Sequence, residues 1–331
     1  MHPPSPQDQI FDLGLGLMRA RLVQVFAELR IADYLAAGQQ SVPGTHAPFL
    51  DRFLRACATI GLVTTQPDGT FQLTPVGETL RSGVPGSMRA MMASLLGGGH
   101  LRAWGNLRAS LERGVTAFDD LHGEGVWSYF TKTNPDEGNV FNQAMSDFSH
   151  AVIPAILGSF QFPATGTLVD VAGGNGTLLC AALGQQPGLR GIVTDLAFTM
   201  PAAEAYIAAQ GLADRATAVA ADFFSTVPSD ADVYMMKFIL HDWNDVDAGR
   251  ILKTIRAAAN PSSRLLIVEQ VVPEEDLPIP ARIMDINMMV MCGGKERTAP
   301  EWIALLSAHG FTLEFIIPTP SPMSIIQARL S

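Results

Sequence analysis

The sequence predicts an α/β protein in which a smaller, mainly helical domain precedes a parallel sheet covered by helices. The chain has 331 residues, about twice the ~150 residues that are typical of one domain. Short β-like runs alternate with helical stretches in its second half, which is the pattern of a parallel sheet with helices on both faces. The N-terminal part instead follows a helix–hairpin–helix pattern. We therefore expect two domains, at residues 1–100 and 101–331.

The composition suits a large folded core and excludes several classes of protein. Apolar residues make up 47% of the chain and charged residues 16%, with a net charge of −10, which disfavours binding to phosphate backbones. The cysteines (Cys57, Cys180 and Cys292) are odd in number and form no CxxC pair, so we expect neither a disulfide framework nor a zinc ribbon. The N-terminus lacks a basic and apolar leader, and no apolar run reaches the ~18 residues of a membrane span. We expect a reduced, cytoplasmic protein.

Apolar residues recur with helical spacing from Ile10 to Leu35 and fall on more than one face of the predicted helix. A helix that is apolar on several faces must be covered on several faces. Two interpretations stay open: an ordinary buried helix, or a helix exchanged with a second subunit.

The rest of the first domain has the outline of a winged helix. A second amphipathic helix that stops at Gly61, two short strands around a Pro-Asp-Gly turn and a further helix start follow in order, at Phe49–Leu62, Leu62–Thr65, Thr70–Leu73 and Thr74-Pro75. A recognition helix that reads DNA carries clustered basic residues. This one offers only Arg52 and Arg55, beside Asp51, so we do not expect it to bind DNA.

A mainly helical stretch from Leu101 to Phe160 leads into the predicted sheet. Its β-like runs are Thr167–Val171, Gly191–Thr194, Ala216–Ala220, Ala231–Phe238 and Arg264–Val268. Ligands of such sheets bind beyond the carboxyl ends of the strands. Functional residues are therefore expected directly after these runs.

The first strand runs into a turn of small residues, Asp170-Val171-Ala172-Gly173-Gly174-Asn175-Gly176. The turn fails the GxGxxG pattern of dinucleotide sites and matches an acidic DxGxGxG pattern, with Ala172 in the first glycine slot. A carboxylate at this place suits a cofactor with a cationic amino-acid end better than one with a pyrophosphate. S-adenosylmethionine is that cofactor, and the alternative is a purely structural glycine turn.

Acidic residues also end the next two strands. Asp195 is placed to accept hydrogen bonds from ribose hydroxyls, and Asp222 from an adenine amino group, with Phe223 against the ring. A single Asp after a strand is most often a helix cap. Acids at three successive strand ends favour S-adenosylmethionine binding.

A histidine and two glutamates supply candidate catalytic groups. His241 follows the fourth strand, Glu269 ends the fifth, and Glu296 lies further along the chain. A lone histidine is more often structural than catalytic. A histidine that is oriented by a carboxylate at a cofactor site, however, has the properties needed to deprotonate a hydroxyl.

These motifs resemble the two-domain S-adenosylmethionine-dependent O-methyltransferases, which include plant caffeate and acetylserotonin enzymes and bacterial enzymes that tailor polyketides. The resemblance spans nearly the whole chain, and its most specific pieces are Asp222-Phe223-Phe224, Leu240-His241-Asp242-Trp243 and Gly293-Gly294-Lys295-Glu296-Arg297-Thr298. It implies that His241 is the general base, flanked by Glu269 and Glu296, and that the N-terminal domain forms a homodimer. The implied cofactor contacts are Asp170, Gly173, Gly174, Gly176, Asp195, Leu196, Asp222, Phe223 and Lys237. The implied acceptor contacts are Met145, Phe148, Asp242, Trp243, Met284, Asn287 and Met288.

The chain departs from the family pattern at several places. We expect the methyl group of Ala172 to be tolerated, because only some glycines of such turns need a positive φ. The family's frequent proline is missing after Leu196, and the segment Gln39–Pro48 is shorter than usual. Cys292 stands where plant members often have a polar residue near the substrate ring, which argues against phenylpropanoid substrates.

The segment Ile283–Met291 is rich in methionine. Methionines at helical spacing are usually core residues, but in this family the segment lines the acceptor pocket, where thioethers suit an aromatic ring. We expect a planar aromatic or polyketide-like acceptor whose hydroxyl, deprotonated by His241, attacks the sulfonium methyl in line, without a metal. The alternatives are methylation of nitrogen or carbon, a family member with a non-methylating role, and a ligand-sensing DNA-binding regulator.

Overall fold

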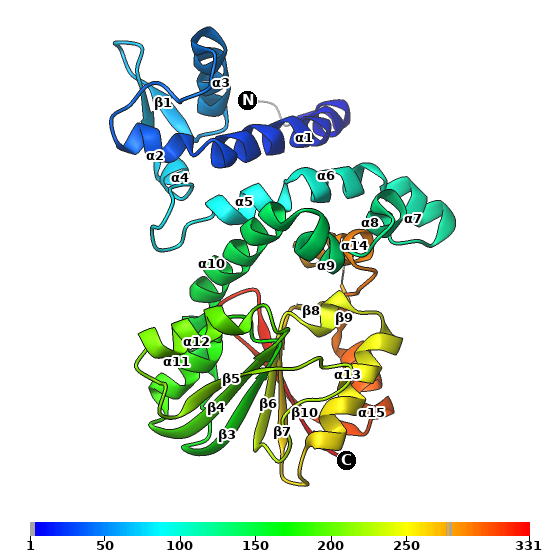
Figure 1. The fold of residues 1–331 in the computed structure, drawn as a ribbon. Coiled ribbons are helices and arrows are strands. Elements are labelled where there is room, and N and C mark those ends of the chain that lie inside the picture. Colours follow the sequence, from blue (N-terminus) through cyan, green and yellow to red (C-terminus); the bar gives the residue numbers. More distant parts are fainter. Residues whose placement is uncertain (1–3, 276, 278–279) are drawn as a thin grey trace. The chain divides into compact units, whose positions relative to one another are not determined.

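The computed structural model describes residues 4–275, 277 and 280–331. The chain forms two compact units (Figure 1). The first consists of Met1–Gly105 with Val126–Phe148, and the second of Asn106–Gly125 with Ser149–Ser331.

The first unit is mainly helical with one β-hairpin. Its elements are α1 (Pro6–Glu28), α2 (Ile31–Ala36), α3 (Ala47–Thr59), β1 (Val63–Thr65), β2 (Phe71–Leu73), α4 (Pro75–Glu78), α5 (Arg89–Leu95), α6 (Gly98–Gly105), α9 (Val126–Ser128), a π-helical turn (Tyr129–Thr133) and the first part of α10 (Pro135–Ser159). Strands β1 and β2 pair antiparallel, and α3 ends shortly before Gly61, whose φ is +77°. The predicted helix, hairpin and helix start are therefore confirmed.

The predicted continuous helix from Ile10 to Leu35 is wrong in one respect. Arg30 adopts a left-handed conformation with φ +52° and separates α1 from α2. Phe26 of α1 and Ile31 of α2 nevertheless pack into the same core. Because both helices bury apolar residues against that core, the apolar periodicity continues across the break and does not reveal it.

The second unit is built on a seven-stranded sheet with the strand order β10-β11-β7-β6-β3-β4-β5. Its parallel centre consists of β3 (Thr165–Val171), β4 (Gly188–Asp195), β5 (Ala216–Ala220), β6 (Val233–Lys237) and β7 (Arg264–Glu269), which confirms the five predicted strands. The chain adds an antiparallel hairpin at one edge, β10 (Phe311–Pro318) and β11 (Ser324–Leu330), that sequence periodicity did not indicate. A short parallel pair, β8 (Val271–Val272) and β9 (Arg297–Thr298), lies outside this sheet.

Helices cover both faces of the sheet, as the sequence predicts. The helices of this unit are α7 (Leu107–Arg113), α8 (Ala117–His122), α11 (Thr177–Gln185), α12 (Met200–Ala209), α13 (Asp245–Ala258), α14 (Ala281–Met291) and α15 (Ala299–Ala308). Helices α11 and α12 lie on one face, and α13 and α15 on the other (Figure 1). After β3 the chain adds β4 and β5 toward one edge of the sheet, and after β6 it adds β7 toward the other edge. Because the crossovers are right-handed, the helices of the two halves lie on opposite faces. The carboxyl ends of β3 and β6 form the switch point where ligands of such sheets bind.

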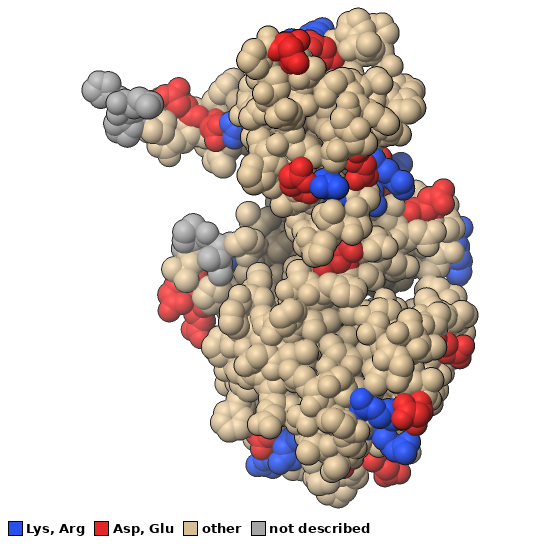
Figure 2. All heavy atoms as spheres, turned by 90° about the vertical axis from the view of Figure 1, so that its left-hand side faces the viewer, with Lys and Arg blue, Asp and Glu red and all other residues tan. Residues whose placement is uncertain are grey.

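Charged side chains are mixed on the surface. On the face shown in Figure 2, Lys and Arg lie beside Asp and Glu instead of forming one continuous basic patch. On α3, Arg55 pairs with Asp51 at 2.8 Å. In the part of the chain that the structure describes, no helix is long and apolar enough to span a bilayer.

Candidate active site

The turn after β3 is shaped by three backbone positions with positive φ. These are Ala172 at +56°, Gly174 at +60° and Gly176 at +78°. Gly173 is required for space, because a Cβ there would lie 2.5 Å from the Asp170 carboxyl carbon. The reason given for the tolerance of the Ala172 methyl group was wrong: position 172 does have a positive φ, and the alanine occupies a left-handed region that L-residues enter at a cost.

Asp170 lies beneath this turn and is only 2% exposed. Burial raises the pKa of its carboxyl to about 7, although the nearby Lys237 ammonium opposes that rise. Lys237 ends β6, the neighbouring strand, and burial lowers the pKa of its ammonium group. Each of these two buried side chains therefore favours the charged form of the other at the switch point.

Asp195 connects the end of β4 to the glycine turn. Its Oδ2 accepts a hydrogen bond from the Gly174 amide at 2.9 Å, and its Oδ1 accepts one from the Leu196 amide at 2.7 Å. Oδ1 also accepts a hydrogen bond from the Thr199 hydroxyl at 3.5 Å, so Oδ2 is the oxygen that keeps room for a second hydrogen bond. The side chain of Leu196 is 48% exposed beside this carboxylate.

Asp222 lies exposed after β5 and caps its own loop. Its carboxylate accepts hydrogen bonds from the Phe224 amide at 2.9 Å and the Ser225 hydroxyl at 3.3 Å. Phe223 and Phe224 pack edge-on against Trp243, with ring centroids 6.0 Å and 4.7 Å from it. The structure thus places Trp243, expected among the acceptor contacts, in an aromatic cluster with a predicted cofactor residue.

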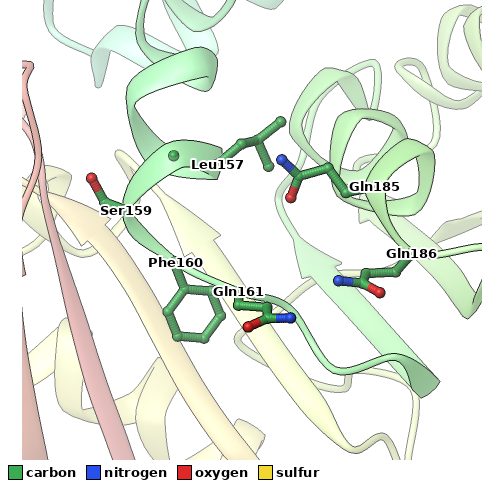
Figure 3. A pocket seen from close by; sticks show the side chains of 7 residues that line it. Leu157, Ser159, Phe160, Gln161, Gln185 and Gln186 are labelled. Atoms are coloured by element: carbon green, nitrogen blue, oxygen red, sulfur yellow. The ribbon is translucent and has the colours of Figure 1, made fainter.

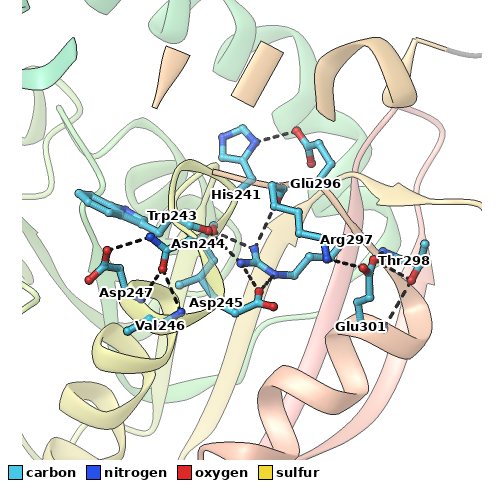
Figure 4. A network of polar contacts seen from close by, with 12 residues as sticks. His241, Trp243, Asn244, Asp245, Val246, Asp247, Glu296, Arg297, Thr298 and Glu301 are labelled. Carbon is cyan, nitrogen blue, oxygen red and sulfur yellow. Dashed lines mark hydrogen bonds and ion pairs between the residues drawn. The ribbon is translucent and has the colours of Figure 1, made fainter. Parts of the chain in front are cut away.

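His241 lies on a 3₁₀ turn (Leu240–Asp242) between β6 and α13 and is only 8% exposed. Its Nδ1 lies 2.8 Å from Oε1 of Glu296 (Figure 4). Its Nε2 lies 3.5 Å from Oδ1 of Asp242. The ring of Phe238, whose φ is +56°, stacks on the imidazole with the centroids 5.0 Å apart. The imidazole is therefore fixed by a carboxylate at one nitrogen and by an aromatic ring on its face.

The charges around His241 shift several pKa values. Burial disfavours the charged imidazolium, but the carboxylates of Asp242, Glu296 and Glu269 outweigh burial and raise the pKa of His241 to about 9. Burial raises the pKa of Asp242 to about 6 and that of Glu269 to about 7, in both cases against the attraction of His241. The carboxyl groups of Asp242, Glu269 and Glu296 thus all act on one imidazole.

Glu269, expected to flank the imidazole, acts on it through its charge and makes its hydrogen bonds to the backbone of the turn. Its Oε1 accepts hydrogen bonds from the backbone amides of Ile239, Leu240 and His241, at 3.2, 2.7 and 3.3 Å. Its Oε2 is buried and has no partner among the described residues. The carboxylate acts on the backbone of the turn, because β7 ends beside β6 and directs Glu269 toward that backbone.

Sequence reasoning missed Arg297 and Phe238. Arg297 is fully buried and donates to the Leu240 and Trp243 carbonyls, both at 2.9 Å. The position of Arg297 next to Glu296 in the Gly-Gly-Lys-Glu-Arg-Thr motif could have identified it as a site residue. The left-handed backbone of Phe238 had no signal, because its neighbours are ordinary strand residues.

The methionine-rich helix α14 reaches this site through Cys292. The Cys292 thiol donates to the Met288 carbonyl at 3.4 Å and lies 3.8 Å from Oδ1 of Asp242. Asn287 and Met288 are buried, and Met284 is partly exposed. Met145 and Phe148 lie on the part of α10 that belongs to the first unit.

A surface pocket lies toward the amino ends of the sheet strands, away from the switch point (Figure 3). It is lined by Leu157, Gly158, Ser159, Phe160, Gln161, Gln185 and Gln186. Helix α11 starts beyond the carboxyl end of β3 and ends at Gln185, so these glutamines lie toward the amino ends of the strands. The described lining residues include none that titrates near neutral pH, and we therefore place the chemistry at the switch point.

Comparisons with known proteins identify the family of this chain. The O-methyltransferase domain family matches residues 104–312. The phenazine O-methyltransferase PhzM of Lysobacter antibioticus is 39% identical over 95% of this chain and 93% of its own length. The 8-amino-8-demethylriboflavin N,N-dimethyltransferase of Streptomyces davaonensis is 31% identical over 99% of this chain and 97% of its own length. A solved structure of the O-methyltransferase NcsB1 from neocarzinostatin biosynthesis, in complex with S-adenosylmethionine and 2-hydroxy-5-methyl naphthoic acid, has a TM-score of 0.83 and 32% identity, covering 94% of this chain and 96% of that one.

Proposed function

Because this chain belongs to the O-methyltransferase family, we propose that it methylates a hydroxyl of an aromatic or polyketide-like small molecule, with His241 as the general base. The enzyme depends on S-adenosylmethionine. The observation that carries the proposed role of His241 is its 2.8 Å contact with Glu296 in a buried turn at the switch point.

The residues at the strand ends fit S-adenosylmethionine. A Cβ on Gly174 would meet nothing within 4 Å, so this stretch of backbone is open to a ligand. Asp195 keeps unused acceptor capacity, and the exposed Asp222 carboxylate lies beside Phe223. We assign the amino-acid end to Asp170 and the glycine turn, the ribose to Asp195 with Leu196, and the adenine to Asp222 with Phe223. We also include Lys237, at the end of β6, among the cofactor contacts.

Bound S-adenosylmethionine supplies a methyl group on a positively charged sulfur, which is already activated for transfer. The chain therefore has to hold the acceptor and remove its proton. Glu296 occupies Nδ1 of His241, which leaves Nε2 to take the hydroxyl proton. Asp242, 3.5 Å from Nε2, stabilises the imidazolium that forms. Much of the rate acceleration comes from alignment of the reacting atoms.

We assign the acceptor to a site beside the His241 turn that α14 lines with Met284, Asn287 and Met288. Flexible thioethers adapt to a planar ring and make favourable sulfur–aromatic contacts. Relatives that act on a phenazine or bind a naphthoic acid support an aromatic acceptor.

Methylation of nitrogen is a second candidate, because a relative of similar length is named as an N,N-dimethyltransferase. Labelled S-adenosylmethionine and a panel of aromatic phenols and anilines separate the two. We expect label in an O-methyl group. Label in an N-methyl group alone would replace the proposed reaction, and transfer to neither class would refute an aromatic acceptor.

We also propose that the first unit forms a homodimer through α1. Ile10, Phe11, Leu13, Leu17 and Met18 of this helix are 59–74% exposed. An apolar strip of this kind on a folded surface marks an interaction site. A two-fold symmetric second copy of the chain is the commonest cover for it.

A further inference from the structure

The polar backbone groups of the His241 turn are satisfied from two sides. On the amide side, the N–H groups of Ile239, Leu240 and His241 all donate to one oxygen of Glu269. On the carbonyl side, the His241 oxygen accepts from the Lys295 amide at 2.7 Å. The Leu240 and Trp243 carbonyls accept from Arg297. Buried backbone groups without partners are costly, so these contacts define where the turn can lie.

All three guanidinium nitrogens of Arg297 donate hydrogen bonds to groups in and around this turn (Figure 4). Nη1 donates to the carbonyls of Leu240 and Lys295, at 2.9 and 3.2 Å. Nη2 donates to the Trp243 carbonyl at 2.9 Å, and Nε and Nη2 both donate to Asp245, at 3.0 and 2.8 Å. The side chain is fully buried. A lysine has three donors on one nitrogen and cannot reproduce this planar fork.

The segment that carries Arg297 also carries Glu296, the partner of the His241 ring. A Cβ on Gly294 would overlap the His241 carbonyl oxygen, so the segment runs directly along the turn. The Glu296 amide donates to Asp285 at 3.0 Å. A displacement of Arg297 would therefore shift the ring and its carboxylate partner relative to each other.

We propose that Glu269 and Arg297 are a positioning pair, which holds the His241 turn from its amide side and its carbonyl side and so sets the contact between His241 and Glu296. Neither residue has to touch the acceptor for this role. The inference rests on the proposed function of His241 as the base. It assigns Glu269 a task that differs from bracketing the imidazole.

The test compares Arg297→Lys with Arg215→Lys as a matched control. Arg215 also ties backbone carbonyls together, those of Leu183, Gln186 and Leu189 at 2.8–3.0 Å, but at the amino-end edge of the sheet. The chain has 7 histidines, and the His241 signal in the NMR spectrum of ¹⁵N-histidine-labelled protein is identified by its loss in His241→Gln. This measurement requires neither cofactor nor acceptor.

We expect Arg297→Lys to lower kcat by roughly 10- to 100-fold, because a displacement of about 1 Å has effects of this size. The KM for S-adenosylmethionine should stay within about threefold, and the titration of the His241 signal should move toward its ordinary range as the Glu296 contact loosens. Arg215→Lys should lower thermal stability and leave both kcat and the His241 titration unchanged. An Arg297→Lys variant that loses stability but keeps the wild-type titration and kcat would overturn the proposal.

Two further variants keep the proposal testable if Arg297→Lys does not fold. Asp245→Asn removes the ionic partner of Arg297 at a side chain that is 61% exposed, and we expect the same changes at a smaller size. Glu269→Gln keeps an acceptor oxygen for the three amides, whereas Glu269→Leu does not. Both variants remove a charge that raises the pKa of His241, so both should move its titration to lower pH, but only Glu269→Leu should lower kcat as Arg297→Lys does. Equal damage from both would contradict the amide-side role.

If the titration shifts as expected but His241→Gln keeps full turnover, the positioning pair stands and the base assignment fails.

Discussion

His241 and Glu296 share a contact of 2.8 Å between Nδ1 and Oε1, and both side chains are almost completely buried. The carboxylate orients the ring and favours its protonated form. A third group, Asp242, lies 3.5 Å from the other ring nitrogen.

His241→Gln should lower methyl transfer by roughly 10²–10⁴-fold, the usual contribution of a general base. S-adenosylmethionine affinity, measured by calorimetry, should remain near that of the wild type because other residues hold the cofactor. The acceptor must have a hydroxyl that stays protonated at the assay pH. Near-normal turnover on such an acceptor would remove His241 from the base role.

The acceptor kcat/KM should rise with pH up to about 9, the raised pKa of His241. The imidazole accepts a proton only in its neutral form, so each pH unit below that pKa reduces the active fraction about tenfold. Glu296→Gln removes a carboxylate that raises this pKa, and the rising limb should move to lower pH. A wild-type profile that is flat from about pH 6 to about pH 9 contradicts the assignment.

Asp195→Ala should weaken S-adenosylmethionine binding by roughly 1.5–3 kcal/mol, the range for hydrogen bonds to charged groups. The substitution also removes the acceptor for the Gly174 amide, so Asp195→Asn, which keeps an oxygen, should lose less. Calorimetry is the measurement. Unchanged affinity in the Ala variant would mean that the cofactor lies elsewhere.

Ala172→Gly should stabilise the protein by about 0.5–1 kcal/mol, since a left-handed L-residue is disfavoured by ~1–2 kcal/mol and glycine loses part of that gain in chain entropy. Gly174→Ala, at φ +60° and with open space around its Cβ position, should destabilise through the same strain. Denaturant unfolding measures both. Destabilisation by Ala172→Gly would show that the methyl group contributes packing that outweighs the strain.

Leu13→Ser with Leu17→Ser should convert a dimer into a monomer without unfolding the first unit. Both side chains are more than half exposed on α1, so their replacement leaves the core of the unit intact. Light scattering gives the mass, and Leu111→Ser on α7, which is 72% exposed, is the matched control. A wild-type mass of 35.4 kDa at micromolar concentration with full activity would contradict the dimer.

A truncated chain that begins near Ala36 should aggregate or lose activity.

The sequence by itself determined the architecture and indicated where the chemistry is expected. Strand–helix alternation predicted the parallel sheet, and the rule that ligands bind at the carboxyl ends of strands directed attention to Asp170, Asp195 and His241. The prediction of the architecture succeeds because periodicity and turn composition are local properties of the chain. The first unit's hairpin and its following helix start were recognised for the same reason.

Only the tertiary structure decided which groups meet. Glu296 reaches the imidazole across 55 residues of sequence, while Glu269 turns to the backbone and the unassigned Arg297 completes the turn. The strained conformations of Ala172 and Phe238 were equally hidden. Contacts between distant segments, and loop dihedral angles that L-residues disfavour, arise from the packing of the whole unit, which overrides local preference and leaves no periodic signal in the sequence.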